Sequence, residues 1–396
     1  MRRLRILVTT TGHAGHVLPL VPFVRAWQSA GHQVLVAAPR SRADLARSAG
    51  FALRPFDEPD EQDVWPLFQA AFEATPDEAN EIVIGRIFAD AKKRAALPGI
   101  LSAIQDWRPD VIVRESYEFA AVLAAEHHGL PHVRVGPGLA STEELVNGIA
   151  LAAAPDLPGD EIRESPYLSL NPPALDDPAA PSPARVHRFR SIEHMRRRLP
   201  DWWPGNDDPL VYLSFGSVAG GMDFLFPRVY RAALEQLAEL PARVLVTIGN
   251  EREPLELGPQ PANVRVERWV PQADVAARAA AMVVHGGYGT VHGALCAGVP
   301  LVVAPLFADQ PLNARRVAEL GAGIALPEPS SLARLADDAP ELFAELGLAV
   351  EHVLVDSRYR HAARRVARSA ATLRPVHASI GVLLRAVAES DDALAA

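Results

Sequence analysis

One stretch of the chain, Arg268 to Gln310, limits the folds that it can adopt. A short apolar run, Met282–Val284, is followed by the glycine-rich turn His285–Thr290 and by an apolar segment that ends at Gly298. A second apolar run, Leu301–Ala304, comes next. This order of strand, glycine turn, helix and strand predicts a parallel β-sheet with a helix on its face.

The same stretch places polar groups where a ligand could bind. The first N–H groups of the expected helix have no partners, so the glycine turn favours an anion, and His285 and Thr290 add side-chain donors. Asp309 and Gln310 follow the next strand and carry groups that suit hydroxyls. Because parallel strands end at one edge of a sheet, the two sites should be neighbours. Taken alone, the turn could equally serve only to pack a helix against a strand.

Length and composition indicate two domains and exclude several classes of protein. A chain of 396 residues exceeds one ordinary core and fits two domains of roughly 150 to 200 residues each. The formal charge of −9 argues against nucleic acid as a partner, because phosphates require a basic face. The single cysteine, Cys296, rules out an internal disulfide. The N-terminus has the pattern of a strand and no apolar run is long enough for a membrane span, so we expect a cytoplasmic protein without stable membrane insertion.

Strand and helix patterns alternate in both halves, which is typical of doubly wound α/β domains. The expected strands are Leu4–Val8, Val34–Ala37, Val111–Val113 and His132–Val135 in the first half, and Leu210–Phe215, Arg243–Ile248, Val264–Val266, Met282–Val284 and Leu301–Val303 in the second. Between the halves, Pro155–Pro209 is dense in Pro, Asp and Arg and predicts a connecting region with a domain boundary near residue 200. Its Arg-rich part, Arg185–Arg198, is interpreted as a solvated linker or linker helix rather than a phosphate-binding track.

Six residues of the opening stretch make it resemble a known signature. They are Trp269, Gln272, His285, Thr290, Asp309 and Gln310. In this order the chain resembles the bacterial natural-product (antibiotic) glycosyltransferases of the GT-B fold, which are related to plant secondary-product UDP-glucosyltransferases. The resemblance implies two Rossmann-like doubly wound domains whose parallel sheets face each other across a cleft. Residues 1–200 would bind the acceptor and end in the Pro-rich linker, residues 201–375 would bind the donor, and the helix in residues 376–396 would cross back to the first domain.

The resemblance also assigns roles in a donor site. Trp269 would stack beside the nucleobase, Val270 would supply backbone hydrogen bonds to its edge, and Gln272 would lie near the base or ribose. The diphosphate would be surrounded by Ser217, His285, Gly287, Gly289 and Thr290, and the sugar hydroxyls would be held by Asp309 and Gln310. Relatives that use uridine donors commonly carry a glutamate at the position of Gly293. Because this acceptor for the ribose hydroxyls is missing, we expect a deoxyribose nucleotide and hence a dTDP-sugar.

The first half carries a candidate base in Thr11–Pro19, TGHAGHVLP. An imidazole at a strand-to-helix junction can take a proton near neutral pH, although two histidines spaced this way could also bind a metal or serve only the loop. The resemblance selects His16 as the base, with His13 as a neighbour in the pocket. Glu115 is the candidate for orienting His16, at a position where relatives often hold an aspartate. Whether its longer side chain reaches His16 is open, and Glu118 is the weaker alternative.

The acceptor pocket is expected in the first domain. Its candidate residues, besides His13, are the aromatic residues Trp65, Phe68, Phe72 and Phe88 of the irregular-looking region Pro59–Gly99. Three of them have helical spacing, so ordinary core packing is the alternative to a lid over a hydrophobic acceptor. No D-x-D sequence occurs, and we expect neither a metal nor another cofactor beyond the nucleotide-sugar co-substrate.

Together these features predict an inverting, metal-independent glycosyltransferase of the hexosyltransferase type. It would move a deoxy sugar from a dTDP donor to a hydroxyl of a hydrophobic natural product such as a polyketide or antibiotic aglycone. A UDP-sugar enzyme of the same fold and a noncatalytic nucleotide-sugar-binding partner protein are the alternatives. Both substrates are small molecules, and a homodimer is compatible with the sequence.

Overall fold

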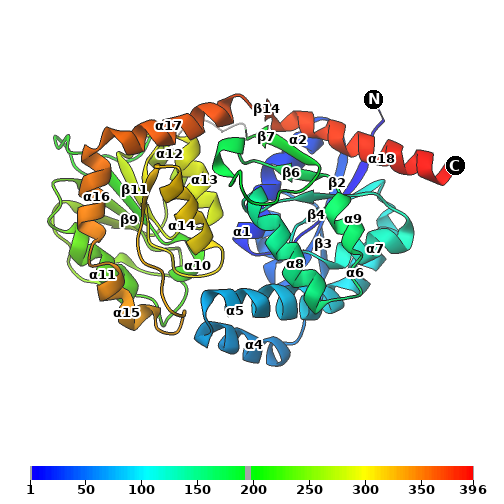
Figure 1. Cartoon of the computed structure of the whole chain (residues 1–396), viewed down its shortest axis with the longest axis horizontal. Helices are drawn as coiled ribbons and strands as arrows, with labels where there is room; N and C mark the ends of the chain where they lie inside the picture. The colour runs from blue at the N-terminus through cyan, green and yellow to red at the C-terminus, as the bar shows by residue number, and fades with distance from the viewer. Residues whose placement is uncertain (1, 192–197, 396) are drawn as a thin grey trace. The chain divides into compact units, whose positions relative to one another are not determined.

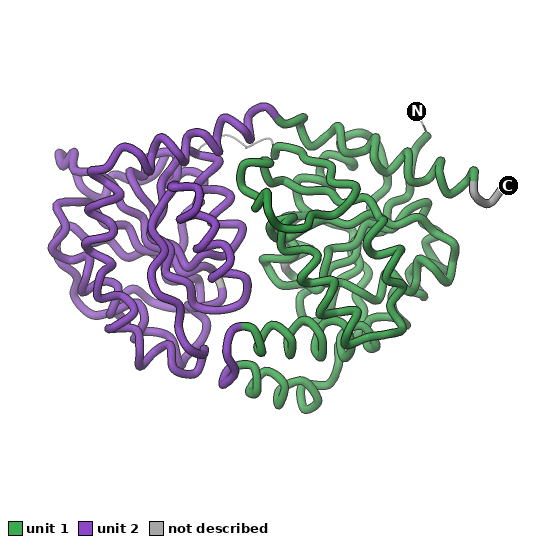
Figure 2. Tube along the Cα trace, in the orientation of Figure 1, with its two compact units in different colours: residues 1–71, 77–192, 373–396 green, residues 72–76, 193–372 purple. Residues whose placement is uncertain are grey.

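The structure is a computed structural model that describes residues 2–191 and 198–395, apart from the side chains of Leu45, Ser217 and residues 393–395. The chain forms two compact units (Figure 2). Unit 1 comprises residues 1–71, 77–192 and 373–396, and unit 2 comprises residues 72–76 and 193–372. The C-terminal segment therefore belongs with the N-terminal half of the chain.

Unit 1 is built on an eight-stranded sheet in which all paired neighbours are parallel. In spatial order the strands are β14 (Arg374–Pro375), β7 (Val186–Arg190), β6 (Tyr167–Ser169), β5 (His132–Val135), β4 (Val111–Glu115), β1 (Arg5–Thr9), β2 (Gln33–Pro39) and β3 (Leu53–Phe56). The order of the strands reverses at β1, between β2 and β4. Such a reversal opens a crevice at the carboxyl ends of the two strands, where ligands of α/β proteins bind.

Helices cover both faces of this sheet (Figure 1). The helices that accompany these strands in the chain are α1 (Ala14–Val17), α2 (Val21–Ser29), α3 (Ala43–Ser48), α4 (Glu61–Glu73), α5 (Pro76–Asn80), the π-helix η3 (Glu81–Lys92), α6 (Lys93–Trp107), α7 (Ala120–His128), α8 (Glu143–Ala153), α9 (Gly159–Glu164) and α18 (Ile380–Ala395), with 3-10 turns at Leu18–Leu20, Arg40–Arg42, Ala140–Thr142, Pro173–Leu175 and Val376–Ser379. Ile6 packs in a core with Trp27 of α2 and Leu383 of α18, whereas Leu7 packs in a core with Ile104 of α6. Alternate residues of β1 thus face opposite cores, as in strands buried on both sides.

Unit 2 has a six-stranded parallel sheet with the order of a Rossmann fold. Its strands in space are β10 (Val264–Glu267), β9 (Arg243–Thr247), β8 (Leu210–Ser214), β11 (Ala281–Val284), β12 (Leu301–Val303) and β13 (Gly323–Ala325). Its helices are α10 (Gly216–Ala219), α11 (Arg228–Leu237), α12 (Gln272–Ala276), α13 (Tyr288–Cys296), α14 (Gln310–Glu319), α15 (Leu335–Leu342), α16 (Leu346–Val355) and α17 (Ser357–Ala371), with a 3-10 turn at Pro254–Leu257. The reversal here lies between β8 and β11. Every strand that the sequence predicted is present, and no end differs from the prediction by more than two residues.

The interpretation of Arg185–Arg198 as a linker is wrong for its first part. Val186–Arg190 forms strand β7, which pairs with β6, and Phe189 is fully buried against Phe23. The strand escaped prediction because its arginines and the surrounding prolines mask a single inward-facing phenylalanine. The MRRR sequence at 195–198 falls almost wholly on residues 192–197, outside the described residues.

The region Pro59–Gly99 is helical and not irregular. It contains α4, α5, the π-helix η3 and the first half of α6. Pro66 and Pro98 lie inside α4 and α6. Prolines at these positions remove backbone donors and weaken the sequence signal for a helix, although tertiary packing retains both helices.

Candidate active site

His16 and Glu115 meet where strands β1 and β4 end. His16 lies in α1, directly after the turn that follows β1, and Glu115 is the last residue of β4 and fully buried. The imidazole Nδ1 lies 3.0 Å from the Glu115 carboxylate Oε2, an ion-pair distance, although the oxygen lies off the direction of a hydrogen bond. The glutamate side chain is therefore long enough to reach the histidine.

The Glu115 carboxylate is held by two further donors. The Thr11 hydroxyl donates to Oε2 at 3.1 Å, and the backbone N–H of Tyr117 donates to Oε1 at 2.8 Å. Both oxygens are thus engaged, which fixes the orientation of the carboxylate toward His16. Tyr117 and Thr11 were not among the predicted site residues.

Aromatic rings surround the His16 imidazole. The Tyr117 ring meets it edge-on, with centroids 5.1 Å apart, and the Phe88 ring lies at 5.7 Å. The His16 side chain keeps 20% of its surface exposed. Since Nδ1 faces Glu115, Nε2 is the ring nitrogen that this contact leaves available to another partner.

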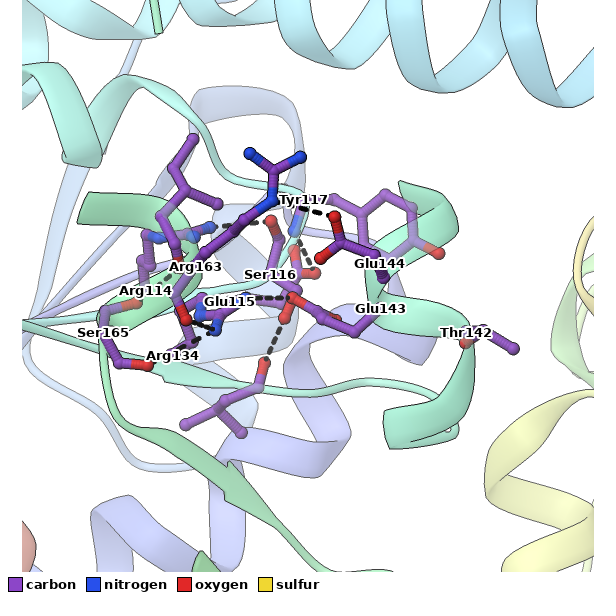
Figure 3. Close-up of polar contacts among 12 residues, drawn as sticks. Arg114, Glu115, Ser116, Tyr117, Arg134, Thr142, Glu143, Glu144, Arg163 and Ser165 are labelled. Atoms are coloured by element: carbon purple, nitrogen blue, oxygen red, sulfur yellow. Dashed lines mark hydrogen bonds and ion pairs between the residues drawn. The ribbon is translucent and has the colours of Figure 1, made fainter. Parts of the chain in front are cut away.

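A buried ionic network supports the strand ends that carry Glu115 (Figure 3). Arg114 and Arg134 face each other in the β4–β5 pairing and are both fully buried. Arg114 donates to the Ser116 carbonyl at 2.7 Å, and Arg134 pairs with Glu143 of α8 at 2.9 Å. Burial, and next the Arg134 charge, lower the pKa of Arg114 to about 10. Arg114 and Ser116 hold the backbone beside Glu115 against β5, and Arg134 separately links β5 to α8.

Only one feature of the sequence indicated these buried ionic contacts, namely the arginines within the apolar runs VIVRE (111–115) and HVRV (132–135). A charge in a strand that is buried on both faces requires a partner, so each arginine implied a nearby acceptor. The sequence could not identify Glu143 as that partner, because it lies on a different element.

The alternative acid, Glu118, caps a helix. Its carboxylate accepts from the N–H groups of Ala120 and Ala121 at the start of α7, at 3.0 and 3.1 Å. Burial raises its pKa to about 7. Glu115, and not Glu118, is the carboxylate that contacts His16.

The structure brings two of the five acceptor-pocket candidates close to the His16 ring. They are Phe88, which is buried, and His13, whose ring lies 6.5 Å from that of His16. Burial is the main cause that lowers the pKa of His13 to about 3, so it is neutral at physiological pH. Trp65 lies on α4 with 48% of its surface exposed. Phe68 is half-buried on the same helix.

Phe72 lies on the same helix, one turn after Phe68. It belongs to unit 2, where its ring packs 5.7 Å from that of Phe224. Helical spacing alone could not predict this, because α4 continues into a segment that is packed with the other half of the chain.

In unit 2 the predicted glycine turn lies at the reversal between β8 and β11. His285 follows β11, and its ring lies against two glycines. A Cβ at Gly216 would lie 2.6 Å from Cε1 of the ring, and one at Gly287 would lie 2.4 Å from Nε2. Burial lowers the pKa of His285 to about 4, so the imidazole is neutral. Only glycines leave room for the ring at this strand edge.

The residues expected beside the nucleotide lie next to one another on α12 and α13. Trp269 precedes α12 with 61% of its surface exposed, whereas Val270 is buried. The Gln272 amide donates to the backbone carbonyl of Thr290 at 3.4 Å. A Cβ at Gly293 would lie 2.9 Å from that same amide nitrogen. Ser217 lies in α10, but its side chain is outside the described part of the structure.

Asp309 and Gln310 follow β12 as predicted, but Gln310 is only 3% exposed. Its amide oxygen accepts from the N–H groups of Leu306 and Phe307 at 2.9 and 3.1 Å, which organises the loop after the strand. Asn313, which the sequence did not reveal, donates to the Gly286 carbonyl at 2.9 Å and to Asp309 at 2.8 Å. The glycine turn and Asp309 are thereby joined.

Neither a metal-ligand cluster nor a membrane-spanning helix occurs among the described residues. Over residues 2–191 and 198–395, no three His, Cys, Asp or Glu side chains converge as a metal site would require. Within the same ranges, no helix has the length and apolarity needed to cross a bilayer.

Comparisons with known proteins agree with this geometry. The family described as erythromycin biosynthesis protein CIII-like matches the chain with its N-terminal domain at residues 25–166 and its C-terminal domain at residues 231–385. The L-demethylnoviosyl transferase of Streptomyces niveus is 31% identical over 375 residues, which cover 92% of this chain and 93% of that protein.

Solved structures show the same architecture. The glycosyltransferase SnogD from Streptomyces nogalater is similar with a TM-score of 0.72 at 25% identity, over 98% of this chain and 100% of that one. The spinosyn rhamnosyltransferase SpnG complexed with thymidine diphosphate is similar with a TM-score of 0.75 at 22% identity, over 96% and 100%. The predicted fold class and enzyme class are confirmed, and the chain belongs to the erythromycin biosynthesis protein CIII-like family of bacterial natural-product glycosyltransferases with the GT-B fold.

Proposed function

We propose that this enzyme transfers a deoxy sugar from a dTDP-sugar to a hydroxyl of a hydrophobic natural product, with inversion at the anomeric carbon. The observation that carries the proposal is the 3.0 Å contact between His16 and the buried carboxylate of Glu115. A histidine oriented by a carboxylate, with its second nitrogen unshielded, is suited to general-base catalysis.

The reaction follows from this pair. His16 takes the proton of the acceptor hydroxyl on Nε2, and the Glu115 carboxylate stabilises the resulting imidazolium. The acceptor oxygen then attacks the anomeric carbon while the bond from that carbon to the diphosphate oxygen breaks. A single displacement of this kind inverts the configuration. Because the base and its acid need no intermediate bound to the protein, we expect no glycosyl-enzyme intermediate.

We assign the departing diphosphate to the glycine turn of unit 2. Gly287 and Gly289 let a ligand approach the backbone at the start of the nine-residue helix α13, whose first N–H groups favour an anion. His285 and Thr290 are the side chains of this turn, Ser217 belongs to the neighbouring helix, and Asp309 with Gln310 would serve the sugar. Since the Gln310 oxygen is already engaged with the loop, we expect Asp309 to contribute more directly than Gln310.

Three residues support a thymidine nucleotide as the donor. Trp269 exposes a ring on which a base could stack, and Gln272 lies beside Gly293 on the neighbouring helix. Position 293 is a glycine, so no carboxylate is present there to accept hydrogen bonds from the two ribose hydroxyls. A 2′-deoxyribose therefore forgoes no hydrogen bond at this position. The fold accommodates this nucleotide, since a relative of the same architecture is solved with thymidine diphosphate.

The two halves of the chain would then bind different substrates. We propose that residues 1–200 bind the acceptor and residues 201–375 bind the donor, with the C-terminal helix of residues 376–396 completing the first domain. Phe88 and His13, which lie beside His16, are the best placed of the predicted acceptor residues.

The test is to supply α-linked dTDP- and UDP-sugars together with a panel of aromatic and aliphatic alcohols, and to assign the anomer of each product by NMR. We expect β-linked products and a preference for dTDP donors. Retention of configuration would overturn the mechanism, and equal use of UDP donors would support the alternative nucleotide. Tight nucleotide binding without transfer to any acceptor would favour a noncatalytic binding protein.

A further inference from the structure

The lysines of this chain are confined to one place. Of the 39 basic residues only Lys92 and Lys93 are lysines, and the others are arginines. Lys92 ends the π-helix η3 and Lys93 begins α6. Both line a pocket at the carboxyl ends of the unit 1 strands, together with Thr11, Phe88 and Tyr117. These three residues are the ones that contact Glu115 or His16.

The two lysines differ in their partners. Lys93 is 4% exposed, and its ammonium pairs with both carboxylate oxygens of Asp156 at 2.5 and 2.6 Å. The Lys92 ammonium lies over the Phe88 ring, 4.9 Å from its centroid. Among residues 2–191 and 198–395, no carboxylate lies within ion-pair distance of Lys92. Lys93 is therefore a structural cation, whereas Lys92 is a cation without a counterion at a pocket.

Several charged groups act on Lys92 from the elements around it. Burial lowers its pKa most strongly, Arg42 acts in the same direction, and Glu58 and Glu115 oppose them. Neither glutamate is close enough to form an ion pair with it. A half-buried ammonium in this state gains most from a negatively charged ligand, because the ligand restores part of the lost solvation.

The aromatic rings specify what such a ligand carries besides its charge. Phe88 contacts both functional groups, with its ring 4.9 Å from the Lys92 ammonium and 5.7 Å from the His16 ring. The Tyr117 ring packs 5.6 Å from that of Phe88 and 5.1 Å from that of His16. A planar aromatic molecule that packs on these rings can present one oxygen to His16 and another to Lys92.

We propose that Lys92 is a specificity-determining residue that binds an anionic oxygen, a carboxylate or a phenolate, of an aromatic acceptor. This inference rests on the proposed function, since it assigns the acceptor class of the same site. His16 takes the proton of the reacting hydroxyl, and Lys92 holds the anionic group and so orients the ring. Neutral alcohols of the same shape bind without this contact and are poorer acceptors.

The chain allows a direct measurement of this contact. Protein grown with lysine labelled with 13C at the ε-carbon gives two side-chain signals, and Lys92→Arg identifies which of them is Lys92. We expect 6-hydroxy-2-naphthoate to shift the Lys92 signal and to leave the Lys93 signal in place, whereas 6-hydroxy-2-naphthamide shifts neither. Titration with 4-nitrophenol at pH values above and below the pKa of its hydroxyl tests the phenolate in the same way. Equal shifts with the anionic and neutral probes, or none with either anion, would overturn the proposal.

Kinetics with the same acceptors provide the second arm. Lys92→Met should raise KM for the naphthoate about tenfold or more and leave KM for the naphthamide nearly unchanged, because the charge-assisted contact is lost only with the anion. Lys92→Arg should retain the preference. Lys93→Met is the matched control. It removes the ion pair with Asp156, so we expect lower thermal stability but the same preference for the naphthoate over the naphthamide.

The outcomes of these two experiments distinguish a failure of the Lys92 assignment from a failure of the proposed function. The NMR shift requires binding but no transfer, so a selective shift without turnover supports the Lys92 site while it counts against the proposed reaction. Transfer that proceeds equally well to anionic and neutral acceptors, in both the wild type and Lys92→Met, would contradict the Lys92 assignment and leave the proposed reaction intact.

Discussion

The two units share the strand order around their first strand but place different groups where that order reverses. In both, the strand order reverses beside the first strand of the sheet, between β1 and β4 in unit 1 and between β8 and β11 in unit 2. The reversal in unit 1 carries a histidine paired with a buried carboxylate. The reversal in unit 2 carries a neutral histidine enclosed by glycines. The same strand-order reversal therefore holds a histidine–carboxylate pair in one unit and a neutral histidine beside open backbone in the other.

The difference shows that the topology determines where a site lies, whereas individual residues determine its chemistry. The topology determines that a strand end, a turn and a helix start lie together. The residues after the strand decide whether the crevice contains fixed charge, as with Glu115, or open backbone, as at Gly287.

The largest effect is expected from His16→Ala. Removal of the base should lower kcat by about 10²–10⁴-fold, because the acceptor hydroxyl then has no group to take its proton. Affinity for dTDP, measured by calorimetry, should stay unchanged, since the proposed nucleotide site lies in unit 2. Full transfer activity in this variant would contradict the role of His16, and loss of dTDP binding would contradict the division between the units.

Arg134→Met should mainly affect the stability of unit 1. It leaves Glu143 buried without its cation, which costs about 3–5 kcal/mol of unfolding free energy. Hydrogen exchange followed by mass spectrometry should show faster exchange in β4 and β5 and unchanged exchange in β8 and β11. The double variant Arg134→Met/Glu143→Gln is the control and should recover part of the loss. Equal losses in the single and double variants would contradict a role for the charge pair.

Gly287→Ala should disturb unit 2 in a comparable way. The added methyl group would lie 2.4 Å from His285 Nε2, so the ring or the turn has to move, at a cost of about 1–3 kcal/mol in stability. Weaker dTDP binding and a lower unfolding temperature are expected. Gly289→Ala is the matched control for stability, because nothing lies within 4 Å of its added Cβ and alanine favours the helix. If both variants lose equal stability, the contact with His285 is not the cause.

Gly293→Glu should change selectivity rather than stability. Only the end of the flexible Gln272 side chain stands in the way of a side chain at this position. The new carboxylate can accept from both hydroxyls of a ribose, so we expect affinity for UDP to improve about tenfold relative to dTDP. Gly293→Gln is the control that keeps the size and removes the charge. An unchanged ratio of the two affinities would show that another residue reads the ribose.

The sequence predicted the strands and the turns that follow them because their signals are local. Apolar runs followed by glycine turns lie within a few residues, as at Met282–Thr290, and the resemblance then identified His16 and Glu115. Contacts between distant segments were not predictable. Tyr117, Asn313 and the Arg134–Glu143 pair depend on which elements pack together, and Phe189 was masked by the arginines around it.

The smallest effect concerns the pH dependence of stability. Burial raises the pKa of Glu118 in unit 1 from the ordinary 4.5 to about 7, so the folded state holds a proton that the unfolded state releases earlier. The stability that this group contributes is therefore present below about pH 4.5 and is lost as the pH rises to about 7. His285 in unit 2 acts in the opposite sense. Its pKa falls from 6.5 to about 4, so its contribution is present above pH 6.5 and is lost as the pH falls to about 4.

Glu118→Gln should consequently make stability rise more steeply with pH between 4.5 and 7, because the histidine contribution is then no longer opposed by the glutamate. Urea unfolding at a series of pH values measures the slope, and exchange rates in α7 and in α13 assign it to the two units. Glu118→Asp is the control that keeps a carboxylate at the start of α7. An identical pH profile for Glu118→Gln and the wild type would mean that the cap, and not the buried proton, is what Glu118 contributes to unit 1.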